Sequence, residues 1–260
     1  MIKEAEEILT QTQKAIRRAL GEVLLAPAEA SSLDEIDRIR KAYRRRGMLG
    51  LDERYSLVDP ANLYLFQRRE RAFLSLLRQQ SLSLTHIRVL DIGCGTGEVL
   101  NDFVRYGADP LLLAGIDLLP ERIERAHRRN PRISFSIASA EKLPYPDGAF
   151  DLCLQFTLLS SVLDGEVRRC IAAEALRVLR PNGVVILYDF IWDPTNRDVR
   201  GIRLGEVRRL YPACELSAHR VTLAPPLSRR LAPVSWTLCR VFEALPFLCS
   251  HHLVAIRKGP

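Results

Sequence analysis

The 260-residue sequence lacks any uninterrupted apolar run of about 18 residues, the length that a helix needs to cross a bilayer. Its beginning has no basic segment followed by an apolar one, so no secretory signal is predicted. The six cysteines show no Cys-x-x-Cys spacing, and neither they nor the five histidines suggest a metal site. We therefore expect a cytoplasmic protein with reduced core thiols and no metal; association with the cytoplasmic face of a membrane stays open.

Lysine is also scarce, occurring only at positions 3, 14, 41, 142 and 258, so arginine supplies most of the 38 basic residues. The net charge of +7 fits either a solvated arginine-rich surface or attraction to an anionic partner, such as a phosphorylated substrate, a lipid headgroup surface or RNA. Arginine pairs recur along the whole chain without forming one basic block, and no RNA-binding signature is present. Nucleic acid is therefore a disfavoured partner.

The most informative segment, residues 89–97, reads Val-Leu-Asp-Ile-Gly-Cys-Gly-Thr-Gly. An apolar run meets Asp91, three glycines follow at alternate positions, and a helical pattern resumes at Glu98. This pattern predicts a buried strand, a turn whose backbone approaches a ligand, and a helix, as at the cofactor-binding turn of an open α/β sheet. The spacing is neither that of a dinucleotide site nor that of a P-loop, and the carboxylate suits a cationic ligand better than a phosphate.

Asp-Ile-Gly-Cys-Gly-Thr-Gly resembles motif I of the class I S-adenosylmethionine (SAM) methyltransferases, whose cofactor carries a sulfonium and an ammonium group. The resemblance implies SAM as the cofactor. It also implies that the turn residues bind it: Asp91, Gly93, Cys94, Gly95 and Gly97. A nucleotide site or a structural glycine turn are the alternatives that the turn alone leaves open.

Three later segments resemble the same family. Residues 114–118 are an apolar run ending in an acid, which implies that Asp117 binds both ribose hydroxyls, with Leu118 beside it; capping of the next helix is the alternative role. Residues 139–151 resemble the family's run between its third and fourth strands, and residues 174–187 its helix, turn and fifth strand. The resemblance covers about residues 85–190.

The adenine contacts depart from the family pattern at one position. Ala140 matches the residue whose backbone meets the adenine ring. The family usually has Asp, bound to the exocyclic amine, where this chain has Ser139. Glu141 is expected either to replace that contact or to be solvated.

Strands alternate with helices through the central part of the chain, which predicts a parallel sheet with right-handed crossovers. Strands are expected at 88–92, 112–117, 133–137, 151–156, 184–189, 214–222 and 252–257. Helices are expected at 98–106, 120–129, 166–179 and 203–210. The resemblance adds an antiparallel last strand beside the fifth. The expected fold is a doubly wound, seven-stranded, mostly parallel Rossmann-like sheet over residues 85–260.

Residues 1–84 are expected to form a helical extension, with helices over 2–25, from Ser32 to Gly47, and from Asp59-Pro60 to about Leu77. In the family, such an extension packs over the cofactor end of the sheet and helps to close the site. Covering apolar surface and forming a homodimer contact are the alternatives.

A long insert, residues 223–250, separates the last two expected strands. From Val234 it is expected to form a helix with Trp236 toward its polar side and a stripe of apolar residues on the other: Val234, Leu238, Val241 and Leu245. Three roles stay open for it, namely a core helix, a lid over the substrate, or a surface that dips into a lipid interface.

Methyl transfer from SAM is an in-line displacement, so the protein must chiefly hold the acceptor in position, and a general base is needed only for a weakly acidic acceptor. Gln155 is expected to meet the amino-acid part of the cofactor and Phe156 to wall the methyl group. Asp189, after the fifth strand, is the candidate base, with capping as its alternative role. Candidate substrate-binding residues are Phe156, Ser160, Trp192, Asn196 and Trp236.

The sequence therefore predicts a SAM-dependent methyltransferase that O-methylates a small-molecule, sugar or lipid-linked acceptor. A catalytically silent SAM-binding scaffold and an RNA or protein methyltransferase are the alternatives. The Asn/Asp-Pro-Pro-Tyr run of many RNA N-methyltransferases is absent after the fourth strand.

Overall fold

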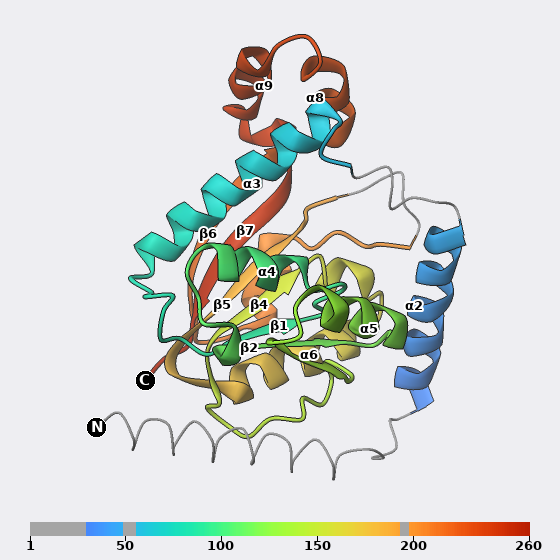
Figure 1. Ribbon diagram of the computed structural model, residues 1–260, viewed down its shortest axis with the longest axis vertical. Helices are drawn as coiled ribbons and strands as arrows, with labels where there is room; N and C mark the ends of the chain where they lie inside the picture. Colours follow the sequence, from blue (N-terminus) through green and yellow to red (C-terminus); the bar gives the residue numbers. More distant parts are fainter. Residues whose placement is uncertain (1–29, 49–55, 193–197) are drawn as a thin grey trace.

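A computed structural model describes residues 30–48, 56–192 and 198–260 (Figure 1). The expected helix over 2–25 and the candidate Asn196 lie outside these residues. A seven-stranded sheet forms the centre, in the order β3-β2-β1-β4-β5-β7-β6. Its first five strands pair in parallel, and β7 lies antiparallel between β5 and β6. The predicted fold class is confirmed.

The strands are β1 (Val89–Ile92), β2 (Leu113–Asp117), β3 (Ser134–Ile137), β4 (Phe150–Phe156), β5 (Leu179–Phe190), β6 (Glu215–Leu223) and β7 (Cys249–Arg257). Six of them lie within three residues of their expected bounds, but β5 begins five residues earlier than predicted, because Leu179 already pairs with Phe150 of β4 before a shift in register. The last strand begins three residues earlier than predicted. It pairs on both sides, with Phe190 of β5 and Val221 of β6 both opposite His251, and this pairing extends it beyond its apolar stretch.

The helices are α2 (Ala30–Met48), α3 (Pro60–Gln79), α4 (Glu98–Arg105), α5 (Pro120–Arg129), α6 (Gly165–Val178), α7 (Leu204–Leu210), α8 (Pro225–Leu231) and α9 (Trp236–Glu243). Within the described residues, three single 3₁₀ turns lie between helices and strands, η2 (Pro110–Leu112), η3 (Leu159–Ser161) and η4 (Pro246–Leu248). Asp59 begins α3 as expected, because its carboxylate accepts the backbone N–H groups of Ala61 and Asn62. None of the described helices is long and apolar enough to span a membrane.

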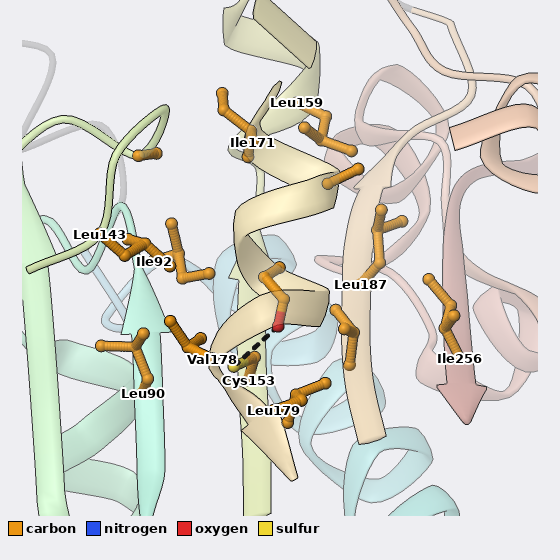
Figure 2. Close-up of a cluster of buried hydrophobic side chains, with 14 of the residues drawn as sticks. Leu90, Ile92, Leu143, Cys153, Leu159, Ile171, Val178, Leu179, Leu187 and Ile256 are labelled. Atoms are coloured by element: carbon orange, nitrogen blue, oxygen red, sulfur yellow. Dashed lines mark hydrogen bonds between the residues drawn. The ribbon is translucent and has the colours of Figure 1, made fainter. Parts of the chain in front are cut away.

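The sheet is covered by helices on both faces. One layer contains Phe73 of α3, Phe103 of α4 and Ile123 of α5 over Leu154 of β4. Figure 2 shows the opposite layer, where Ile171 and Val178 of α6 pack with strand residues that include Leu90, Cys153 and Leu187. Since successive side chains of a strand face opposite sides, neighbouring residues of β4 and β5 belong to different layers.

The two described helices before the sheet occupy different places. α3 packs against β6, β7 and α8, whereas α2 stands at the other side of the molecule, beside α5 (Figure 1). α2 is held there by polar contacts to the segment after β4: Glu35 accepts the backbone N–H of Leu163 at 2.6 Å, and Arg38 donates to the carbonyl of Ser161. α2 therefore reaches the carboxyl edge of the sheet, and α3 does not cover the same region.

The insert departs from prediction. It forms two short helices, α8 and α9, and the second begins at Trp236, where the hydroxyl of Ser235 accepts the backbone N–H of Leu238. The apolar stripe is exposed to solvent, by 79% at Val234 and 60% at Val241. The interpretation as a core helix is wrong: periodicity revealed an apolar face, but the buried contact of α9 is made by Cys239 on another side.

Candidate functional site

The glycine turn has the geometry that its sequence predicts. Gly93 and Gly97 have φ angles of +78° and +77°, in the left-handed region that favours glycine. A Cβ at Gly93 would lie 2.9 Å from Leu158 Cδ1, and one at Gly97 would lie 2.8 Å from Phe135 Cζ. The backbone N–H of Gly93 donates to Ile116 at the end of β2. The turn is therefore held against the next strand, with no room for side chains at these two positions.

Asp117 joins the turn to the following helix. One of its carboxylate oxygens accepts the backbone N–H of Gly95 at 2.9 Å, and the other accepts that of Leu119 at 3.0 Å. Arg122 of α5 lies 3.8 Å from the same carboxylate. Asp117 therefore holds the segment that leads into α5, whose N-cap residue is Leu119, and it also lines the pocket described next.

A pocket lies at the carboxyl ends of β1, β2 and β4. It encloses about 760 Å³ of space free of protein atoms, part of which is open to solvent. Seven predicted site residues line it: Gly93, Asp117, Leu118, Ser139, Ala140, Glu141 and Phe156. The structure thus brings together residues from four separate motifs.

Helix α2 forms one wall of this pocket through Glu35, Ile36, Ile39 and Tyr43. The hydroxyl of Tyr43 lies 3.3 Å from that of Ser161, and the Arg122 guanidinium lies 4.0 Å above the Tyr43 ring. The sequence analysis missed these residues as site residues. Their helical spacing is visible in the sequence, but nothing in it shows which surface the apolar face covers.

Asp91 lies below the turn and does not line the pocket. It is 1% exposed, and its Oδ1 has no hydrogen-bond partner among the described residues. Burial, followed by repulsion from Asp117, raises the pKa of Asp91 to about 8. Cys94 belongs to the apolar core, and burial raises the pKa of its thiol. Of the remaining turn residues, Gly95 and Gly97 contribute backbone shape and not pocket surface.

Gln155 and Asp189 do not line the pocket, so their expected contacts with cofactor and substrate stay predictions. Both are fully buried in the layer covered by α6 and α7. Gln155 accepts the hydroxyl proton of Tyr211 at 2.7 Å. Asp189 accepts the backbone N–H groups of Ser160 and Phe190 at 3.0 and 2.8 Å, and burial raises its pKa to about 6. This geometry gives Asp189 the capping role.

Three other candidate substrate-binding residues, Ser160, Trp192 and Trp236, also do not line the pocket. Ser160 is fully buried, and its neighbour Ser161 lines the pocket instead. Trp192 and Trp236 are 51% and 38% exposed, and neither lines the pocket. No residue of the insert 223–250, all of which is described, contributes to the pocket, so the structure gives no support to a lid over it.

A second, smaller pocket lies on the far side of Phe156, between that ring and helices α3 and α4, where Arg69, Phe73 and Tyr106 line it. Phe156 therefore forms a wall common to both pockets. Its ring contacts Phe73 edge-on at 5.4 Å and Tyr188 at 5.5 Å between centroids.

The aromatic contacts continue from Phe156 across the sheet. Tyr188 stacks on His251 at 4.7 Å, and His251 contacts Phe190 at 4.1 Å. The hydroxyl of Tyr188 bonds that of Thr222 at 2.9 Å. Since Tyr188 and His251 are buried, this row of rings belongs to the packing between β4, β5 and β7.

Within the described ranges, no group of three or more His, Cys, Asp or Glu side chains is placed to hold a metal ion. The site consists of the glycine turn, three acids (Glu35, Asp117 and Glu141), Arg122 and an apolar cleft.

Comparison with known proteins agrees with this arrangement. A methyltransferase-domain family model matches residues 89–183. The chain is 36% identical over 115 residues to 27-O-demethylrifamycin SV methyltransferase from Amycolatopsis mediterranei, covering 42% of this chain and 40% of that protein. It is 31% identical over 157 residues to a ubiquinone/menaquinone biosynthesis C-methyltransferase from Citrifermentans bemidjiense, covering 58% and 64%. The chain thus spans less than two thirds of the length of these relatives.

Among solved structures, the fold is similar to that of geranyl diphosphate C-methyltransferase from Streptomyces coelicolor, determined with S-adenosyl-L-homocysteine. The TM-score is 0.55, with 15% identity over 73% of this chain and 77% of that one. At this identity the likeness concerns the fold alone. The motifs, the sheet and the family match together identify the chain as a member of the class I SAM-dependent methyltransferases, a family whose cofactor is SAM.

Proposed function

We propose that this chain transfers the methyl group of SAM to a hydroxyl group of a small, largely apolar acceptor. The observation that carries the proposal is the main pocket, in which Gly93, Asp117 and Ala140 come together and Phe156 closes one side. The acceptor would meet the methyl group on the side of the Phe156 wall.

The residues present fit SAM. Asp117 faces the pocket with a carboxylate suited to two hydroxyl donors, and the buried Oδ1 of Asp91 lacks a partner close to the turn. When bound, SAM supplies a methyl group already activated by its positive sulfur. Asp117 would hold the ribose, and Ala140 and Glu141 would contact the adenine. Ile36 and Ile39 of α2 would exclude water from one side.

The acceptor class follows from the surface around Phe156. Aromatic rings and apolar side chains dominate it, which favours an acceptor with a flat apolar body. The relative named as a 27-O-demethylrifamycin SV methyltransferase supports oxygen as the acceptor atom.

The test uses SAM carrying a ¹³C-labelled methyl group and the purified chain with panels of phenols, polyketide-like alcohols, sugars and lipid-linked hydroxyl compounds. The carbon chemical shift of the product identifies the atom that receives the methyl group. An O-methyl product is expected. An N- or C-methyl product would contradict the proposal that the acceptor atom is oxygen. If the chain binds SAM but transfers no methyl group to any compound or to fractionated lysate, a catalytically silent SAM-binding scaffold is favoured instead.

Asp117→Ala is expected to weaken SAM binding by roughly 1–3 kcal/mol, because it removes a charged hydrogen-bond acceptor for the ribose. Calorimetry measures the dissociation constant. Asp109→Ala is the matched control: Asp109 likewise accepts a backbone N–H two residues on, from Leu111, but lies at the other end of β2. Equal SAM affinity in the wild type and the Asp117 variant would refute the assignment.

Asp91→Asn should change how stability depends on pH. In the folded chain the pKa of Asp91 is about 8, above its unfolded value of about 3.9, so the folded state holds a proton that the unfolded state releases. As the pH rises from about 4 to about 8, the free energy of unfolding of the wild type should therefore fall, by at most about 1.4 kcal/mol per pH unit. The variant lacks this titrating group, so its free energy of unfolding should not show this fall. Urea unfolding across this range measures the difference, and parallel curves would contradict it.

A further inference from the structure

Large apolar side chains are exposed in one region far more than elsewhere. Twelve such side chains are exposed within the described residues, and seven of them lie in the 14 residues from Val234 to Phe247. We call these seven the α9 apolar surface: Val234, Trp236, Leu238, Val241, Phe242, Leu245 and Phe247. Isolated exposed apolar residues are ordinary, but a continuous set of this kind marks an interaction surface.

The α9 apolar surface is presented by a firmly attached helix. Cys239 of α9 is fully buried in a cluster with Tyr64 of α3, and the ring of Trp236 contacts Tyr64 edge-on at 5.8 Å. Glu243 accepts hydrogen bonds from the Tyr64 hydroxyl at 2.9 Å and from Arg68. Figure 1 shows α8 and α9 projecting beyond the end of α3, away from the sheet. The exposed side chains are therefore those on the outer side of an anchored projection.

The charge around this surface has one sign. Glu243 is the only acid between residues 224 and 248, and it is paired with Arg68. Arg229, Arg230 and Arg240 are exposed on α8 and α9. Helices that lie in the headgroup region of anionic membranes typically combine exposed Trp, Phe and Leu side chains with flanking arginines. Self-association would instead bring like charges of two copies together.

We infer that the α9 apolar surface docks on bilayers that contain anionic lipids. The apolar side chains would enter the boundary between headgroups and acyl chains, and the three arginines would meet lipid phosphates. Trp236, half-buried against Tyr64, would lie at the depth where tryptophan is enriched in membrane proteins.

Helix α3 connects this surface with the proposed acceptor side. Tyr64 contacts α9, whereas Arg69, five residues on, contacts the Tyr188 ring, and Phe73 contacts Phe156. Docking would therefore bring the acceptor side near a bilayer in which an apolar acceptor dissolves. Only this consequence rests on the proposed function; the docking itself does not.

The test exploits the tryptophan content. The chain has two tryptophans, Trp192 and Trp236, so Trp192→Phe leaves Trp236 as the single reporter. Vesicles of phosphatidylcholine with phosphatidylglycerol should shift its fluorescence to the blue, and brominated lipids should quench it; pure phosphatidylcholine vesicles should do so much less. Cosedimentation should fall by about tenfold or more when Val234, Val241 and Phe247 are all changed to Ser. Changing both Arg229 and Arg230 to Gln should remove much of the salt dependence.

Ile137→Ser, which alters an exposed apolar residue on β3, is the control and should leave vesicle binding unchanged. Unshifted Trp236 fluorescence with anionic vesicles, or undiminished sedimentation of the triple Ser variant, would overturn the inference. A concentration-dependent dimer that the triple variant loses would show that a second copy covers the surface. Methyl transfer to a soluble acceptor without vesicles should be unchanged in the triple variant, so failure of docking and failure of the proposed function are distinguishable.

Discussion

Replacing Arg168 with alanine is expected to lower the free energy of unfolding by about 3–5 kcal/mol, the scale for removing one partner of a buried charged network. Arg168 of α6 is fully buried. Its guanidinium donates at 2.7 Å to each of three acceptors, the carbonyls of Val162 and Arg200 and the carboxylate of Glu206. One side chain therefore ties together α6, the segment after β4, the segment after β5, and α7.

The cost has two sources. Alanine leaves two carbonyl oxygens without their donor and opens a space that the surrounding side chains fill only in part. Glu206 retains 23% exposure and a contact with Arg200, so water and that arginine compensate part of its loss. We therefore expect the loss in the free energy of unfolding to lie near the lower end of the range of about 3–5 kcal/mol. A fully enclosed ion pair would lose more.

Arg168 also positions the pocket. Val162, whose carbonyl it binds, lines the pocket together with Thr157, Leu158 and Ser161. SAM affinity should therefore fall in the Arg168 variant as well, measured by calorimetry at a temperature where the variant remains folded.

Arg169→Ala is the control for this prediction. Arg169 is the next residue of the same helix, but its side chain is 61% exposed and pairs with the exposed Glu166. Its replacement should change stability by less than about 1 kcal/mol. Urea unfolding compares the two variants, and equal losses would show that the buried network does not stabilise the fold.

The features predictable from sequence are those encoded within a few residues. The strand that ends near Asp91, the glycines with positive φ and the cap at Asp59 each depend on local conformational preferences, and all appear as expected. The family resemblance implied that Asp117 and the turn bind one cofactor, and the structure places Asp117 and Gly93 at one pocket. The hydrogen bond from Gly95 to Asp117 was not predicted.

The errors arose where a long-range choice decides the outcome. β4 and β5 are buried on both faces, so the sequence does not reveal which of their polar side chains face the ligand. Gln155 is instead bonded to Tyr211, and Asp189 to the backbone N–H groups of Ser160 and Phe190. For α9, the periodic stripe was real, but its orientation depends on how Cys239 and Glu243 attach the helix to α3. The role of α2 likewise depends on contacts across more than 100 residues of sequence.

Gly97→Ala is expected to cost about 2–5 kcal/mol of stability and to weaken SAM binding. Alanine at a φ of +77° costs roughly 1–2 kcal/mol. Its Cβ would lie 2.8 Å from Phe135 Cζ and 3.2 Å from Ala126 Cβ, inside a packed layer, and overpacking of this kind costs about 1–3 kcal/mol. Relief of the clash requires movement of the turn that holds the cofactor side of the pocket.

Gly107→Ala separates the two contributions. Gly107 also has a positive φ, +97°, but a Cβ there meets nothing within 4 Å, so alanine should show only the conformational cost. The difference between the two variants in urea unfolding then measures the overpacking against Phe135. Only Gly97→Ala should reduce SAM affinity in calorimetry, because Gly107 lies at the far end of α4 from the turn. If both variants bind SAM as the wild type does, the position of the turn does not depend on its contact with Phe135.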